Sequence, residues 1–477
     1  MPAFSLRAAA AAAALALTSV SALAATAERA PMPRLSLPEA GVSGQRAIDL
    51  LGNRLGDVAA HYRRTPQDLR EALLRDAGAL RLDASGRLFY VDELEQALPP
   101  APDHGLQPEN IRGQLAPLDQ TFLLHSRPGA KRTIYLDFNG AVLTNTAWNN
   151  GGGPITAQPF DSDGNVNTNF SDGELERIQY IWQRVAEDFA PFDIDVTTEE
   201  PSPDKLTRAN NSDDVYGTTA LITNTAGVYN CSCGGVAYVG VFDSVGDFYK
   251  PALVFWNMLG SGNEKYVAEA TSHEVGHNLG LSHDGYSGGG YYPGHGDGET
   301  GWAPIMGVGY YENTVQWSKG EYDTANNKED DFVVIGNNGG PLRADDHGNK
   351  AATATPLTVT VNGSNVNLAG SGVIHTRKDK DAFSFSAGAG AGSITVAGDT
   401  RSANLDVSIK LLDAAGNVVA KAKPPATLAA TMNFNLPSAG TYYVIVDGVG
   451  FGNPLNTGYS DYGSLGQYTV TGTAKAP

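Results

Sequence analysis

The sequence predicts a small α/β region at the N-terminus, then an α+β domain with a mixed sheet and a histidine-bearing helix, and finally an all-β sandwich. Two patterns lead to this prediction. Capped amphipathic helices and short apolar strands occupy residues 131–340, whereas short strands between glycine-rich turns fill residues 344–474. Residues 326–346 are acidic, rich in glycine and asparagine and poor in periodicity, so we interpret them as a linker between the two.

The first 24 residues have the features of a secretory signal peptide. Arg7 precedes an apolar run at residues 8–17, and the small residues at 22–24 suit a cleavage site. The run is too short for a spanning helix, and no later stretch reaches that length. The formal net charge of −19 argues against binding to nucleic acid or to an anionic membrane. We therefore expect a secreted monomer, extracellular or periplasmic, with no membrane span.

Residues 25–130 are predicted to form a separate small region. Threonine and proline at 65–66 are typical of a helix N-terminus. Residues 88–91 indicate a strand, and the prolines at 99–102 indicate a linker. The helix is expected to end at Gly78, and its apolar stripe to consist of Leu69, Leu73 and Leu74.

The second region, residues 131–340, contains the clearest helix signals. Residues 133–138 alternate well enough for a first strand, and residues 193–196 for the next. Between them Ser171 and Glu174 form a capping box, and Pro191 stops the helix. The buried face of that helix is predicted to consist of Leu175, Ile178, Trp182, Val185 and Phe189.

One motif in this region indicates metal chemistry. His273, Glu274 and His277 form an H-E-x-x-H pattern, on a helix expected to span residues 263–279. Residues four apart share a helix face, so the two imidazoles can bind one ion, while Glu274 can act on a metal-bound water. Gly280 can adopt a positive φ, which would let the chain turn back and bring His283 round as a third ligand.

Three protein ligands leave the fourth tetrahedral position to water, which is the arrangement of catalytic zinc. Bound zinc lowers the pKa of that water to about 7, so that hydroxide forms at neutral pH. The alternative is a surface helix with stray histidines, since H-E-x-x-H also occurs by chance. Gly280, His283 and the downstream run at 303–307 make that alternative much weaker.

The full pattern, H-E-x-G-H-N-x-G-x-x-H-D followed by A-P-I-M-G, resembles the metzincin metallopeptidases, and most closely their adamalysin or reprolysin branch. Residues 182–192 resemble bacterial reprolysin-like proteins as well. Astacin-like and serralysin-like relatives carry a tyrosine where this chain has Val308, so no tyrosine ligand is expected. The resemblance implies zinc ligands His273, His277 and His283, a general base Glu274, a turn methionine Met306 and a structural Asp284.

The resemblance also implies a place for the substrate. In metzincins the strand before the zinc helix is a sheet edge, to which an extended peptide can add through main-chain hydrogen bonds. The alternative for this strand is a buried position in the sheet. Candidate pocket residues are Tyr310, Tyr311 and Trp317, and His295 is expected to be a surface-loop histidine. The residues of the edge would be Gly235, Val236, Ala237, Tyr238 and Val239.

A propeptide is the interpretation of residues 25–130 that the resemblance favours, and an ordinary N-terminal subdomain is the alternative. A latent enzyme must block the open zinc position. This region contains no cysteine, so a carboxylate would have to serve, with Asp92 and Glu93 as candidates. The two cysteines, Cys231 and Cys233, could form a strained disulfide bond or remain free thiols.

The third region has the pattern of a β-sandwich. Strands are predicted at residues 382–385, 405–412 and 442–446, with a hairpin turn at 413–417. Residues 405–416 and 437–443 resemble the bacterial pre-peptidase C-terminal domain. A Ca²⁺ site is one interpretation of its acidic residues and solvated loops are the other. The residues concerned are Asp345, Asp346, Asp379 and Asp381.

These features predict a secreted zinc endopeptidase that acts on protein or peptide substrates. Zinc-bound water would attack the peptide bond directly, with Glu274 moving the proton. The alternative is a secreted binding or adhesion protein in which the C-terminal sandwich is the working part. Chelator-sensitive proteolysis would separate the two.

Overall fold

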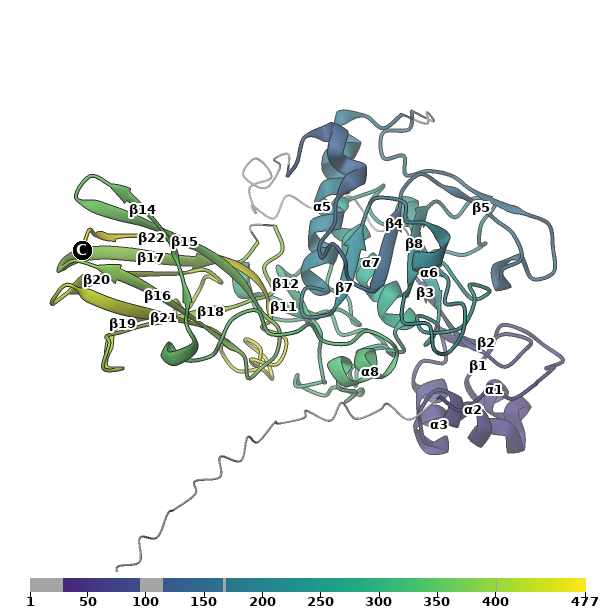
Figure 1. Ribbon diagram of the computed structural model, residues 1–477. Coiled ribbons are helices and arrows are strands. Elements are labelled where there is room, and N and C mark those ends of the chain that lie inside the picture. The colour runs from purple at the N-terminus through teal and green to yellow at the C-terminus, as the bar shows by residue number, and fades with distance from the viewer. Residues whose placement is uncertain (1–28, 95–114, 166–168, 400) are drawn as a thin grey trace, which may run out of the picture.

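The computed structural model describes residues 29–94, 115–165, 169–399 and 401–477. Figure 1 shows three parts: a small helical N-terminal region, a central mixed sheet with helices, and an elongated sandwich that contains the C-terminus. The predicted signal peptide and the prolines at 99–102 lie outside the described residues. Within the described residues, no helix combines the length and the apolar character needed to cross a membrane.

The N-terminal region is built from three helices and three strands. These are β1 (Val42–Ser43), α1 (Gly44–Leu51), α2 (Leu55–His61), α3 (Pro66–Arg75), β2 (Leu80–Leu82) and β3 (Leu88–Glu93). Thr65 caps α3 through a capping box with Asp68. Leu69 and Leu73 are buried as predicted, but Leu74 is 47% exposed, because it lies outside the stripe that faces the core. The helix also ends at Arg75, before the predicted Gly78.

The central sheet has eight strands in the order β1-β2-β3-β9-β10-β8-β4-β7. Strands β10, β8, β4 and β7 run parallel, while β9 is antiparallel to both of its neighbours. The strands not yet located are β4 (Arg132–Asp137), β7 (Ile194–Thr197), β8 (Tyr216–Thr223), β9 (Cys233–Tyr238) and β10 (Ala252–Phe255). The predicted strands at 133–138 and 193–196 are therefore present.

Two helices pack against one face of this sheet, α5 (Asp172–Asp188) and α7 (Glu264–Asn278). The capping box of Ser171 and Glu174 opens α5 as predicted. Asn263 caps α7 and Leu279 ends it, which matches the predicted span because both signals are local. The remaining elements of this part are β5 (Ala141–Leu143), β6 (Ile155–Ala157), α6 (Pro203–Leu206), β11 (Trp302–Pro304), β12 (Thr314–Gln316) and α8 (Asp331–Asn337).

Strand β9, the predicted substrate edge, is not a free edge in this structure. It lies between β10 and β3, and all six of its residues are buried. Val239 follows the strand rather than belonging to it. The physical reason is that β3, from the N-terminal region, forms an antiparallel ladder on the side that would otherwise be open.

Residues 115–130 pack with the central part rather than with the N-terminal region. The backbone amides of Leu115 and Ala116 donate to Oε1 of Gln179 on α5, at 2.8 and 3.0 Å. Thr198, which follows β7, donates its amide to the carbonyl of Leu124 at 3.1 Å. A boundary at residue 130 would cut through these contacts.

The C-terminal part is a sandwich of two five-stranded sheets, ordered β13-β16-β21-β18-β19 and β14-β15-β22-β17-β20. The predicted strands correspond to β16, β18 and β21, and an apolar core lies between the sheets. The strands are β13 (Thr355–Pro356), β14 (Thr358–Asn362), β15 (Asn365–Ile374), β16 (Lys380–Ala387), β17 (Gly390–Ala397), β18 (Val407–Leu412), β19 (Val418–Ala422), β20 (Ala430–Leu436), β21 (Gly440–Gly448) and β22 (Gly466–Lys475).

Buried polar contacts join the sandwich to the end of α5. Asn404 donates from Nδ2 to Oδ1 of Asp188 at 2.7 Å, and the amide of Gln467 donates to Oε2 of Glu187 at 3.2 Å. Asp188 also accepts from the hydroxyl of Ser272, the neighbour of His273, at 2.6 Å. One carboxylate thus connects the sandwich to the histidine-bearing helix.

Candidate metal centre

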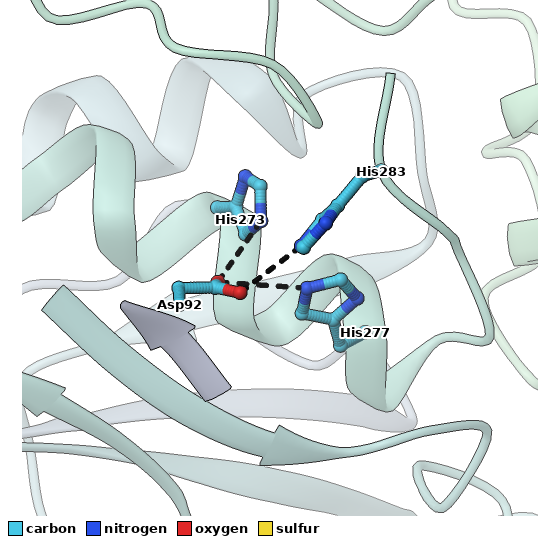
Figure 2. Close-up of side chains that lie close together, drawn as sticks. All are labelled: Asp92, His273, His277 and His283. Carbon is cyan, nitrogen blue, oxygen red and sulfur yellow. Dashed lines mark hydrogen bonds and ion pairs between the residues drawn. The ribbon is translucent and has the colours of Figure 1, made fainter. Parts of the chain in front are cut away.

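Helix α7 and the turn after it bring three histidines together (Figure 2). His273 and His277 lie one turn apart on α7. The helix ends at Asn278 with Leu279 as its C-cap, and Gly280 follows with a φ of +97°. The amide of Leu281 donates back to the carbonyl of Gly276 at 3.0 Å. The chain then returns so that the His283 ring lies 5.0 Å from the His277 ring, centroid to centroid.

Backbone carbonyls fix the orientation of the two helix imidazoles. Nδ1 of His273 lies 2.9 Å from the carbonyl of Ile305, and Nδ1 of His277 lies 2.9 Å from the carbonyl of Leu281. A carbonyl only accepts, so each Nδ1 carries the proton and each Nε2 presents a lone pair. This tautomer is the one that a metal-binding imidazole needs.

The three Nε2 atoms surround the carboxylate of Asp92, which comes from β3. Its Oδ1 lies 3.0 Å from Nε2 of His283, and its Oδ2 lies 3.1 Å from Nε2 of His273 and 3.6 Å from Nε2 of His277. The four ligand atoms lie within 4.8 Å of one another. Nε2 of His273 and of His277 are buried and face a carboxylate, but neither makes a hydrogen bond with any residue that the structure describes.

The lone pairs on Nε2 of His273 and His277 are buried and point at a carboxylate to which they do not hydrogen bond. A cation bound by the three histidines and Asp92 together would explain this arrangement. Three imidazole nitrogens with one carboxylate oxygen make a tetrahedral set that suits zinc. The residues present therefore fit a metal ion at the point where they converge.

Strand β3 carries Asp92 to this point, on the same face as Tyr90. The β3–β9 pairing shifts register between Val91 and Glu93, so Asp92 lies at the shift, where side chains are re-aimed. Two residues earlier on the strand, the ring of Tyr90 stacks on His277, with centroids 4.0 Å apart and planes at 11°. Glu93, the other candidate, is more than half exposed and pairs with Arg81 at 2.5 Å.

Glu274 lies on α7, and its side chain is buried against β9. A Cβ on Gly235 would lie 2.1 Å from its Oε1 and 2.5 Å from its Cδ, so a side chain at that position would displace this carboxylate. Its Oε2 has no hydrogen-bond partner within the described part of the chain. Burial and then the charge of Asp92 raise the pKa of Glu274 well above its ordinary value.

The pKa values of Asp92 and His277 are both lowered, but for different reasons. Burial raises the pKa of Asp92, but the positive charge that His283 and His273 carry when protonated outweighs burial, so the pKa of Asp92 lies well below its ordinary value. Burial lowers the pKa of His277 to about 4. The protein environment therefore favours an ionised Asp92 beside a neutral His277, which are the forms that bind metals.

Met306 packs against α7 at Gly276 and is fully buried. Its Sδ would lie 2.6 Å from a Cβ on Gly276, so a side chain at that position would displace it. The amide of Asp284 donates to the carbonyl of Met306 at 2.7 Å. Backbone contacts thus join the loop after His283 to the methionine.

Other predicted positions lie elsewhere. Trp317 is buried in the core against Phe189 and donates to the carbonyl of Asp188 at 2.6 Å. The cavity that it lines is shared with residues of the sandwich, such as Tyr459 and Tyr462, and not with the three histidines. His295 contacts the Tyr292 hydroxyl at 2.6 Å and is not part of the histidine cluster. Cys231 and Cys233 are joined by a disulfide bond.

The acidic residues of the sandwich form two groups whose ligand atoms also lie within 4.8 Å of one another. One consists of Asp345, Asp346 and Asp381, and the other of Asp345, His375 and Asp379. Asp345 and Asp346 are exposed, and exposed acidic groups are common without an ion. Ca²⁺ at this place stays a prediction.

Two segments of the chain match protein-family models. Residues 192–284, from two residues before β7 to the residue after the third histidine, match the Reprolysin-like model of metallo-peptidase family M12B. Residues 379–448 match the bacterial pre-peptidase C-terminal domain. Both resemblances seen in the sequence are thereby confirmed, and the first match supports a metallopeptidase, a class that implies a metal and typically zinc.

No curated protein sequence matches this chain. Among solved structures, the pre-peptidase C-terminal domain of a collagenase from Bacillus anthracis is 18% identical, with a TM-score of 0.19, and the match covers 26% of this chain and 99% of that one. A periplasmic inhibitor of g-type lysozyme from Aeromonas hydrophila is 13% identical, with a TM-score of 0.18, over 25% of this chain and 94% of that one. Scores this low carry no functional implication.

Proposed function

We propose that this protein is a secreted zinc endopeptidase and that the structure corresponds to its latent form. The observation that carries the proposal is the convergence of three buried Nε2 atoms beside a buried glutamate, inside a segment that matches a reprolysin-like peptidase. His273, His277 and His283 would be the zinc ligands, with Met306 as the methionine beneath them.

Zinc, when held by the three imidazoles, would polarise the scissile carbonyl and make a water molecule more acidic. Glu274 would accept the proton of the attacking water and deliver it to the leaving amine nitrogen. Its burial against Gly235 limits where its carboxylate can go, so proton transfer occurs at one place. No acyl-enzyme forms, because the attacking oxygen comes from water.

Latency would follow because β3 carries Asp92 to the histidines and pairs with β9. With a metal bound to the histidines, Asp92 would take the place that a substrate oxygen needs, and the β3 backbone pairs with the strand to which a peptide would add. We therefore propose that the N-terminal region is a propeptide. Because residues 115–130 pack with α5 and β7, we place its end within 95–114 rather than at residue 130.

Release of β3 would uncover β9 as a sheet edge. Residues 233–238 would then offer main-chain groups to an extended peptide, which supports protein or peptide substrates. Export through residues 1–24 and attachment of the C-terminal domain to a secreted peptidase complete the proposal. A binding protein that works through its sandwich alone is not favoured, because it leaves the histidine cluster unexplained.

The substitution Glu274→Gln tests the mechanism. On the mature protein, kcat/KM for casein should fall by roughly 100- to 10,000-fold, the range for loss of a general base. Zinc content, measured by atomic absorption, should stay near one ion per chain, since the ligands are intact. A chelator should abolish the parent activity.

Glu264→Gln is the matched control, because Glu264 lies on the same helix but pairs with Arg177, 3.4 Å away. It should keep most of the parent activity. If Glu274→Gln cleaved casein at the parent rate, or if the mature parent held no zinc, the proposed function would be wrong.

A further inference from the structure

The hydroxyl of Tyr291 contacts the same oxygen that His283 contacts. It donates to Oδ1 of Asp92 at 3.0 Å, and Nε2 of His283 lies 3.0 Å from that atom. The Tyr291 ring lies 4.3 Å from the His283 ring, centroid to centroid. The phenol therefore faces the point on which the ligand nitrogens converge, although no sequence pattern singled it out.

The loop that carries Tyr291 is held firmly at the next residue. The amide of Tyr292 donates to the carbonyl of Asp284 at 2.7 Å, and its carbonyl accepts from the amide of Val308 at 2.9 Å. The Tyr292 ring stacks on Tyr322, with centroids 4.1 Å apart. Tyr292 is thus anchored on the side away from the histidines, while Tyr291 points toward them.

We propose that Tyr291 is a catalytic residue that donates a hydrogen bond to the scissile carbonyl oxygen of the substrate. This role rests on the function proposed above. The two carboxylate oxygens of Asp92 stand in for oxygens of a reacting peptide: Oδ2 faces the two helix imidazoles, and Oδ1 faces His283 and Tyr291. When Asp92 leaves, the phenol meets whatever oxygen takes the place of Oδ1.

The chemistry at that oxygen explains why a donor there matters. A water oxygen bonds to the carbonyl carbon, the carbonyl oxygen gains negative charge, and the carbon–nitrogen bond then breaks. Glu274 carries the proton from water to the amine, and Tyr291 keeps its own proton throughout. A hydrogen bond that strengthens as charge develops stabilises the transition state more than the substrate.

The competing explanation is that Tyr291 only latches Asp92 in the latent form. The two roles differ in the mature protein, from which Asp92 is gone. The test is therefore Tyr291→Phe in mature protein, with Tyr292→Phe as the matched control. That control removes a neighbouring buried hydroxyl, which contacts His295 instead of Asp92.

Tyr291→Phe should lower kcat about 100-fold, the usual loss for one oxyanion donor, with KM and zinc content near the parent values. Calorimetry with a phosphinic peptide, whose tetrahedral oxygens resemble the transition state, should show a similar loss of affinity. Tyr292→Phe should change neither quantity much.

Each adverse result has a distinct meaning. A Tyr291→Phe variant with parent kcat and parent phosphinate affinity would overturn the catalytic role and leave only the latch. A mature parent without chelator-sensitive hydrolysis would overturn the proposed function itself, and the role of Tyr291 with it.

Discussion

Asp92 lies within 3.6 Å of all three imidazoles of the cluster, whereas Glu93 next to it turns to solvent and pairs with Arg81. Two adjacent carboxylates on one strand therefore have opposite surroundings. Successive side chains of a strand point to opposite faces, and Asp92 shares its face with Tyr90, which stacks on His277.

Replacing Asp92 by alanine should weaken latency. Loss of one partner from a buried charge contact typically costs about 2–5 kcal/mol, so the full-length chain should convert to the mature form about tenfold faster or more. The measurement is the lag before hydrolysis of a fluorogenic peptide, together with the appearance of the mature mass. Glu93→Ala should keep the parent lag; equal lags for both variants would contradict the assignment of Asp92.

The site shows which residues a sequence can reveal. Helical spacing and the turn glycine predicted that His273, His277 and His283 would converge, because those signals are local. Asp92 could be named only as one of two candidates, since its direction depends on pairing with a strand about 140 residues away. Tyr291 was missed, because a glycine-rich loop has no periodicity from which a direction can be inferred.

At the scale of elements, the bounds of α7 were predictable and the neighbours of β9 were not. Asn263 and Gly280 mark the ends of α7 within the helix's own sequence. The resemblance to metzincins predicted a strand at residues 235–239, but it does not say which strand pairs with it in this chain. A long-range partner, β3, turned the predicted edge into an interior strand of the full-length chain.

The contact between Gly235 of β9 and Glu274 of α7 can be tested by substitution. Gly235→Ala places a methyl group 2.1 Å from Oε1 of Glu274, so the carboxylate must move. In the mature protein kcat should fall about tenfold or more, and overpacking should cost about 1–3 kcal/mol of stability. Steady-state kinetics and thermal unfolding measure these two effects.

Gly234→Ala is the matched control on the same strand. The nearest atom to its added methyl group is Cδ2 of Leu259, 3.3 Å away, and a side chain can adjust to that distance. Its kcat should stay close to the parent value. If both variants lost activity equally, general damage to β9 rather than displacement of Glu274 would be the cause.

At the scale of the whole molecule, the sandwich and the central part meet through buried acids at the end of α5. Burial and then the charge of Asp399 raise the pKa of Glu187 well above its ordinary value. The folded protein therefore keeps this proton to a higher pH than the unfolded chain does. The stability that the protonated form contributes is complete below the unfolded pKa of about 4.3 and is lost as pH rises above it.

Glu187→Gln should therefore stabilise the protein at high pH and have little effect at low pH. In a Glu274→Gln background, which prevents self-cleavage, we expect Tm to rise by about 2–4 °C at pH 8, equivalent to about 1 kcal/mol, and to change little at pH 4. Calorimetric scans at both values measure this. Glu176→Gln, an exposed position on the same helix, should show no such dependence; a Tm gain that is equal at both pH values would contradict the explanation.

The ladder between β3 and β9 has a consequence for what happens after cleavage. Phe89, Tyr90 and Val91 are all buried while the ladder exists, and Val239 of the central part belongs to the apolar cluster of the N-terminal region. A detached N-terminal fragment would expose these apolar side chains to water, so it would aggregate or be degraded by proteolysis rather than rebind. Activation would then be irreversible, and each molecule could be activated only once.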